Sequence, residues 1–257
     1  MFDLNIFKKG ICVAMTLAMA NAIAMTAYIP ANAAATQEQT VSISVSETAT
    51  NPTKVTLNKT SATLTVGKTM TLKATLSPKK ATSKLTWTSS NKKIATVDSS
   101  GKVKGVKAGT ATITVKTANG KKATCKVTVI TQKQAYINEV IRLVNAERTK
   151  RGLSKLTTTT ALGKAANKRA TETHTKFSHT RPNGKQWDSI FKEYNISHGA
   201  AAENIAAGYA TPKAVVDSWM NSSGHRSNIL NKNFKKIGVG YAVYNDGYGS
   251  YWTQLFI

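Results

Sequence analysis

The chain has 257 residues, and Lys and Arg outnumber Asp and Glu by 36 to 12, which gives a formal net charge of +24. A hydrophobic content of 41% excludes wholesale disorder, and the length is sufficient for two ordinary domains. So large a positive charge favours polyanionic partners over neutral ones.

Residues 1–33 are typical of a secretory signal peptide. Lys8 and Lys9 precede an apolar run over residues 11–29, and the small-residue sequence Ala-Asn-Ala ends at position 33. Because the run is also long enough to span a membrane, an uncleaved anchor is the alternative. Residues 34–52, rich in Thr, Ser and Ala, predict a flexible segment.

The two cysteines bear on the compartment. Cleavage of the signal would remove Cys12 and leave only Cys125, so we expect no internal disulfide. Export without disulfides suggests a bacterium with a single membrane. We therefore expect a secreted, extracellular protein, and association with the cell wall is a further hypothesis.

Residues 53–130 predict an all-β sandwich. Strand-sized runs such as ATLTVG, LTWTSSN and GTATITVKT recur about every ten residues, separated by Gly-containing turns. Trp87 is expected to pack between the sheets, and a ligand-stacking role is the alternative for it.

The sandwich segment resembles the bacterial Ig-like group 2 domains. The resemblance rests on VTLNKTSATLTVGKTMTLKATL, LTWTSSNKKIATVDSSGKVKGVKAGTATITV and the closing CKVTV, in that order. It implies a spacer or adhesive module with no enzymatic role.

Charge concentrates in this segment. Sixteen lysines stand against one acid, Asp98, between Lys54 and Lys126. Such a field favours anionic cell-wall polymers, anionic lipid surfaces or extracellular glycans, whereas specific nucleic-acid binding is not expected. The alternative is a solvated surface that only aids solubility.

Residues 133–257 predict a second, α+β domain. Apolar residues at helical spacing follow Gln134, a second helix is expected from Thr159 towards Thr173, and a third is expected to carry Trp187. Thr211 and the proline after it begin another helix, and two alternating runs around NDGYG predict a C-terminal hairpin.

Three residues of this domain can bind a metal or move protons: His179, Glu203 and His225. Taken singly, a histidine in such a domain is more often a hydrogen-bonding structural residue, and Glu203 is also compatible with capping a turn. No HExxH, CxxC, GxSxG or P-loop pattern is present, and Cys125 lies in a predicted strand of the other domain.

The second domain resembles the CAP superfamily, also called the SCP or pathogenesis-related-1-like family, in its bacterial form. The motifs are VNAERTKRGLSKL, FSHTRPNG, AENIAAG, VVDSWMNSSGHRSNILN and KKIGVGYA. The resemblance implies an α-β-α sandwich in which His179 and His225 face each other across an open cleft with Glu203 beside them. It also implies a site for Zn²⁺ or another divalent ion on the two histidines.

The same resemblance bears on the residues around the cleft. Many members carry a second acid three residues after the motif tryptophan, and this chain has Ser222 there, which removes a carboxylate and weakens a two-acid mechanism. We predict that a sharp turn of two serines and a glycine, residues 222–224, holds His225, and that Ser222, Arg226, Asn228 and Asn204 support the cleft.

Three functions are compatible with these residues. The leading hypothesis is a secreted binding protein whose basic Ig-like module holds anionic material while the second domain presents a metal-binding cleft. The second is a metal-assisted, peptidase-like hydrolase in which Glu203 acts as base with His179 and His225. The third is a carrier of lipid or sterol.

Overall fold

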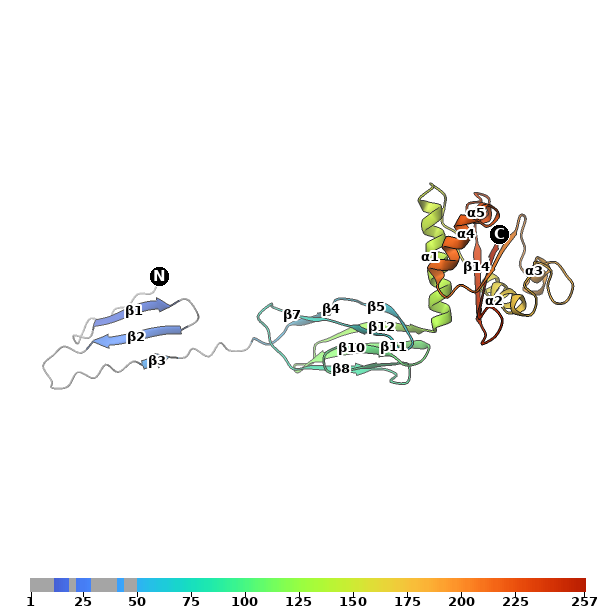
Figure 1. Ribbon diagram of the computed structural model, residues 1–257. Helices are drawn as coiled ribbons and strands as arrows, with labels where there is room; N and C mark the ends of the chain where they lie inside the picture. The colour runs from blue at the N-terminus through green and yellow to red at the C-terminus, as the bar shows by residue number, and fades with distance from the viewer. Residues whose placement is uncertain (1–11, 19–21, 29–40, 44–49) are drawn as a thin grey trace.

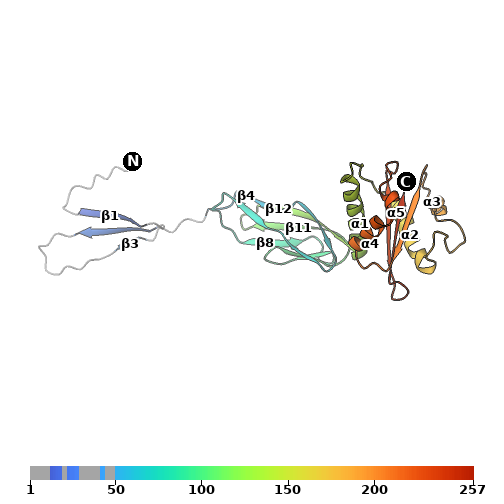
Figure 2. The same ribbon diagram turned by 45° about the horizontal axis from the view of Figure 1, so that its top comes forward.

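The computed structural model describes residues 12–18, 22–28, 41–43 and 50–257. A β-sandwich is followed along the chain by a domain of helices around a sheet (Figures 1 and 2), which confirms the predicted multidomain fold class. The predicted signal peptide and flexible segment lie mostly outside the described residues. None of the helices in the described part of the chain is both long and apolar enough to cross a membrane.

In the described residues before the sandwich, three short strands pair with one another. β1 (Cys12–Ala18) pairs with β2 (Ala22–Tyr28) in antiparallel fashion, and β2 pairs with β3 (Val41–Ile43).

The sandwich is built from a four-stranded sheet in the order β5-β12-β11-β8, a three-stranded sheet β6-β10-β9 and the pair β4-β7. Alternation of apolar and polar residues places Ile113, Cys125 and Val127 in the core between the sheets, fully shielded from solvent. Trp87 packs against this core, as predicted. The strands are β4 (Lys54–Leu57), β5 (Ser61–Thr65), β6 (Thr69–Thr71), β7 (Ala74–Ser77), β8 (Leu85–Ser89), β9 (Ala95–Val97), β10 (Lys102–Gly105), β11 (Gly109–Thr117) and β12 (Lys122–Ile130).

The second domain has three layers. A three-stranded antiparallel sheet, in the order β13-β15-β14, has α1, α4 and α5 on one face and α2 and α3 on the other (Figure 1). This is the α-β-α sandwich that the resemblance implied. The elements are α1 (Gln132–Thr149), α2 (Thr160–Thr175), α3 (Ser189–Glu193), β13 (Ala202–Ala207), α4 (Pro212–Asn221), α5 (Ser223–Ile229), β14 (Ile237–Val243) and β15 (Ser250–Phe256).

Threonine caps begin the three longest helices. The side chains of Thr131, Thr159 and Thr211 each accept a hydrogen bond from a backbone N–H in the first turn of α1, α2 and α4. Since β12 ends at Ile130, Thr131 alone separates the last strand of the sandwich from α1.

Two glycines allow α2 to pack directly on the sheet. A Cβ on Gly238 would collide with the backbone of Leu162, and one on Gly240 would collide with the backbone of Ala166. The close approach of helix and strand fixes the position of α2, which carries residues of the site described below.

Buried Arg148 of α1 holds the segment after α5 in place. Its guanidinium donates to the backbone carbonyls of Ser154, Ile229 and Asn231 at 2.9, 2.7 and 2.8 Å. Burial lowers the pKa of Arg148, and the carbonyl dipoles supply the acceptors that water would otherwise provide.

Two sequence predictions in this domain were inaccurate. The third helix starts at Ser189, so Trp187 precedes it and packs edge-on against Phe191. The sharp turn expected around Ser222 is a break of one residue between two helices, because α4 ends at Asn221 and α5 starts at Ser223.

Candidate functional site

Glu203 lies on β13, an edge strand of the sheet. It pairs with Leu255 of β15 and points toward the α2 layer, where its side chain has no exposed surface. Arg169 of α2 donates from Nε to Oε1 at 2.8 Å and from Nη2 to Oε2 at 3.3 Å. The carboxylate is therefore buried, ion-paired and fixed in orientation.

His179 lies in the loop between α2 and α3 and contacts this carboxylate. Its Nδ1 is 2.7 Å from Oε2 of Glu203, while 53% of its side chain remains exposed. A carboxylate on Nδ1 favours the tautomer in which Nδ1 carries the proton and Nε2 has a lone pair. The outer nitrogen of His179, Nε2, is left without a hydrogen-bond partner among the described residues.

His225 approaches from the other face of the sheet, on α5. Its backbone carbonyl accepts a hydrogen bond of 3.1 Å from the side-chain amide of Asn204, which neighbours Glu203 on β13. Burial lowers the pKa of His225, and the positive charge of a protonated His179 lowers that pKa further. Because burial and the charge of His179 both disfavour its protonation, His225 is favoured in its neutral form near pH 7.

A buried amide cluster supports α5. Asn204 also donates to Oε1 of Gln254 at 2.9 Å, and Asn228 of α5 donates to Oδ1 of Asn204 at 2.8 Å. Asn228 and Asn204 thus join the helix that carries His225 to the strand that carries Glu203.

Ser222 and Arg226 act at the helix ends rather than on the two imidazoles. Ser222 terminates α4 and precedes α5 without a side-chain cap. Arg226 donates to the backbone carbonyl of Met220 at 3.0 Å and lies on the exposed surface.

A buried ion network beneath His179 was not predicted from the sequence. Glu172 of α2 accepts from Arg169 at 2.9 Å and from Arg181 at 2.8 and 2.9 Å, and Arg181 also bonds Glu193 at 2.6 Å. Burial raises the pKa of Glu172, but the hydrogen bonds from Arg181 and Arg169 outweigh it and leave that pKa below its usual value. Glu172, in turn, raises the pKa of Arg181. The spacing of Arg169 and Glu172 within one helix was the available signal, but spacing alone did not indicate burial.

The other two histidines lie apart from this cluster. The ring of His174 stacks on Tyr244 at a centroid distance of 3.7 Å and bonds Asp246. His198 is exposed, packs beside Phe191, and its ring nitrogen Nδ1 bonds the carbonyl of Gly199 rather than Glu203.

Few imidazole, thiolate or carboxylate donors are available to a metal at this site in the described part of the chain. Among the described residues, no group of three or more His, Cys, Asp or Glu side chains is arranged to hold a metal ion. Glu203 is occupied by Arg169 and His179, which leaves the two imidazoles as the available donors. Neutral imidazoles suit zinc and similar divalent ions, so the chemistry of the donors fits such an ion at an open site.

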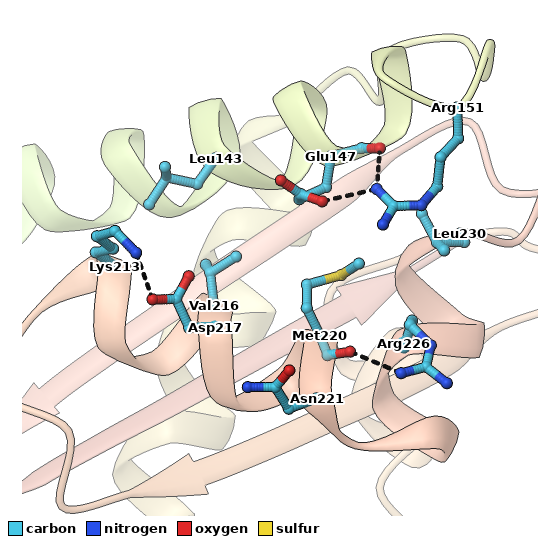
Figure 3. A pocket seen from close by; sticks show the side chains of 10 residues that line it. All are labelled: Leu143, Glu147, Arg151, Lys213, Val216, Asp217, Met220, Asn221, Arg226 and Leu230. Atoms are coloured by element: carbon cyan, nitrogen blue, oxygen red, sulfur yellow. Dashed lines mark hydrogen bonds and ion pairs between the residues drawn. The ribbon is translucent and has the colours of Figure 1, made fainter.

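A separate groove lies between α1 and the α4–α5 pair (Figure 3), with a volume of about 720 Å³. Leu143, Val216 and Met220 supply apolar surface, and the pairs Glu147–Arg151 and Lys213–Asp217 lie along its borders.

Comparison with known families identifies both halves of the chain. The family of cysteine-rich secretory proteins, CAP, matches residues 141–256, and the bacterial Ig-like domain of group 2 matches residues 51–127.

Two curated relatives are similar to the second domain. Protein YkwD of Bacillus subtilis, described as uncharacterized, is 47% identical over 126 residues, which cover 48% of this chain and 47% of YkwD. The uncharacterized membrane protein YlbC of the same organism is 32% identical over 124 residues, covering 46% of this chain and 33% of YlbC. The chain thus spans less than half the length of either relative.

Among solved structures, an extracellular SCP-domain protein from Bacillus anthracis is 28% identical, with a TM-score of 0.44, over 49% of this chain and 41% of that one.

The second domain of the chain is therefore a CAP domain, and the sandwich before it is a bacterial Ig-like domain of group 2. The chain is a CAP-domain protein with an Ig-like module, a combination that indicates an extracellular protein.

Proposed function

We propose that the protein is an extracellular binding protein in which His179 and His225 of the CAP domain hold a divalent metal ion and present a cleft to a ligand. The observation that carries the proposal is the bond of 2.7 Å between Nδ1 of His179 and the buried carboxylate of Glu203. A carboxylate behind an imidazole is the arrangement that orients metal-binding histidines and raises their basicity.

The state of His225 supports the same proposal. A metal ligand must be a neutral imidazole, and the lowered pKa keeps His225 neutral at a pH where an ordinary histidine is partly charged. When bound, the ion would supply a Lewis acid at the cleft. Glu203 and Arg169 would keep His179 in position and leave its outer nitrogen accessible.

A calorimetric titration of zinc into the full-length chain tests the proposal. We expect saturable one-site binding that is lost in the double variant His179→Ala, His225→Ala. The matched control is His198→Ala, since it removes an exposed histidine away from Glu203. Undiminished binding in the double variant, with all proteins equally stable, would refute the metal site.

A hydrolase acting on peptides is the second candidate, and the Glu203–His179 pair favours it. Both carboxylate oxygens of Glu203 are engaged, so His179 rather than Glu203 is placed to accept a proton from an attacking water, with Glu203 as a positioning residue. Turnover of a peptide library by the wild type, lost in a folded His179→Gln variant, would establish this activity. No turnover with or without zinc would exclude it for that library.

Lipid carriage is the third candidate, and the groove in Figure 3 favours it through its apolar surface. Organic extraction of the purified protein followed by mass spectrometry tests it. A co-purified lipid that disappears in a folded variant of a half-buried groove residue, Leu143→Gln, would support lipid carriage, and an empty spectrum would count against it.

The sandwich is proposed to attach the protein to anionic extracellular material such as cell-wall polymers. Its lysines are exposed, and none of them belongs to an ion pair in the described part of the chain. We expect the protein to sediment with cell walls at low salt and to be released as salt rises, because screening weakens such contacts. Sedimentation that is independent of salt would contradict this role.

A further inference from the structure

One face of the Ig-like sandwich consists almost entirely of hydroxyl and ammonium groups. On β8, β11 and β12 of the four-stranded sheet, the outward positions up to Thr128 are all threonine or lysine, and only Ile130 at the end of β12 is apolar. We call this surface the threonine–lysine face. The inward positions of the same strands carry the core residues of the sandwich, so the outward set is not needed for the core.

The strand register arranges these side chains in rows. Lys116 lies opposite Lys122, and Thr112 lies opposite Lys126. Thr114, opposite Thr124, forms the row between them. Neighbouring rows are about 6.8 Å apart along a strand, and paired residues about 5 Å apart across it. Two lysine-containing rows therefore flank a row of hydroxyls.

Within the described residues, no acid forms an ion pair with the lysines of this face. Asp98, the sole carboxylate between Lys54 and Lys126, follows β9 of the other sheet, where it accepts hydrogen bonds from Ser100 and from the backbone of Lys102. The ammonium groups of Lys116, Lys122 and Lys126 have no salt bridge among the described residues. Like charges directly opposite each other in a sheet are destabilising, so an external anion would relieve the Lys116–Lys122 repulsion.

The chemistry of the face indicates the kind of anion. It carries no aromatic side chain on which a nucleobase could stack, because Trp87 points into the core. The sandwich has no arginine, the residue that pairs planar carboxylates with two parallel hydrogen bonds. Lysine binds phosphate as a point charge, and threonine hydroxyls are common donors to phosphate oxygens.

We propose that the threonine–lysine face binds a linear phosphodiester polymer without bases, of the polyol phosphate type, laid across the rows of β11 and β12. This rests on the proposed attachment role of the sandwich and gives that role a location and a ligand class. Because the contacts are made to repeating phosphates, binding depends on charge and salt rather than on sequence.

The test measures binding of the full-length chain to immobilised poly(glycerol phosphate) at several salt concentrations. The face variant is Lys116→Gln, Lys122→Gln, Lys126→Gln. Its matched control, Lys79→Gln, Lys80→Gln, Lys121→Gln, removes the same charge from exposed turn and loop positions outside β8, β11 and β12. Thermal melting and zinc titration check that both variants are folded and that the cleft is unchanged.

We expect the face variant to bind at least about tenfold more weakly and to reduce the slope of log K against log salt by about 2, as three lost phosphate contacts require. The control should lose less than about threefold. A second variant, Thr114→Val, Thr124→Val, keeps the charge and should weaken binding severalfold without changing the slope.

Three outcomes would overturn the proposal. Equal losses in the face variant and its control would mean that only the overall charge acts. Absence of binding by the wild type would remove the ligand class. Tighter binding to duplex DNA or to a sulfated glycan, with the same dependence on the face, would assign the surface to a different polymer. Each outcome is independent of zinc binding by the CAP domain.

Discussion

The two domains of this chain place charge in opposite ways. In the sandwich, lysines cover the outside, and none takes part in an ion pair among the described residues. In the CAP domain, Arg148, Arg169 and Arg181 are buried, and the last two are paired with buried glutamates. Exposed charge contributes little to the free energy of folding and remains accessible to solvent. Buried charge must be paired within the fold, and the pairing fixes the orientation of side chains such as Glu203.

The largest effect on stability is expected from removing one buried charge of the CAP domain. Arg169→Met leaves the carboxylates of Glu203 and Glu172 buried without their shared partner, so we expect the free energy of unfolding to fall by about 3–5 kcal/mol. Urea denaturation measures the change. Lys164→Met, at an exposed position of the same helix, is the control and should change it by less than about 0.5 kcal/mol. A loss below about 1 kcal/mol for Arg169→Met would mean that the network contributes little.

The next test concerns function rather than stability. Glu203→Gln keeps the shape of the side chain but removes the charge behind His179, so we expect zinc affinity to fall about 10–100-fold. Calorimetry of the folded variant measures it. Unchanged affinity would show that Glu203 serves only to satisfy Arg169.

The strands and exposed lysines of the sandwich could be predicted from the sequence, whereas the buried charges of the CAP domain could not. Alternating residues predicted the strands of the sandwich and its exposed lysines, because a strand exposes every second residue whatever surrounds it. The family motifs led to His179, Glu203 and His225. The Arg169–Glu172–Arg181 network forms because the loop that carries Arg181 packs against α2. Helical spacing alone does not indicate which polar face of α2 becomes buried.

The local structure around His225 also could not be predicted from the sequence. Two serines and Gly224 predicted a turn, whereas residues 223–229 form α5. The helix is held by tertiary contacts that local propensity does not include, namely the bond from Asn204 to the carbonyl of His225 and the burial of Ile229.

A smaller effect is expected from pH. The pKa of His225 is lower in the folded protein than the ordinary value of about 6.5, so between these two values the unfolded chain binds more protons. The stability associated with neutral His225 is complete above about pH 6.5 and is lost as pH falls through the folded pKa.

We therefore expect the wild type to lose more stability between pH 7 and pH 5 than His225→Gln. An NMR titration should place the protonation of the His225 ring below pH 6.5. Protonation at or above that pH would contradict the effect of burial.

The smallest change in stability is expected from substitutions on the surface of the sandwich. Replacing Lys116, Lys122 and Lys126 by glutamine should change the free energy of unfolding by less than about 0.5 kcal/mol per site, with a slight gain at low salt because repulsion is relieved. Thermal melting at two salt concentrations measures it. A large loss would mean that these lysines stabilise the sheet itself, and would remove the contrast between the two domains.

The junction between β12 and α1 limits how far the CAP domain can move from the sandwich. A single residue, Thr131, joins the last strand to the helix, and it is itself held as the cap of α1 by a hydrogen bond of 3.1 Å. One residue spans at most about 3.6 Å, so the tether has almost no slack. If the sandwich binds extracellular material as proposed, His179 and His225 would therefore lie at a distance from that material set by the dimensions of the two domains.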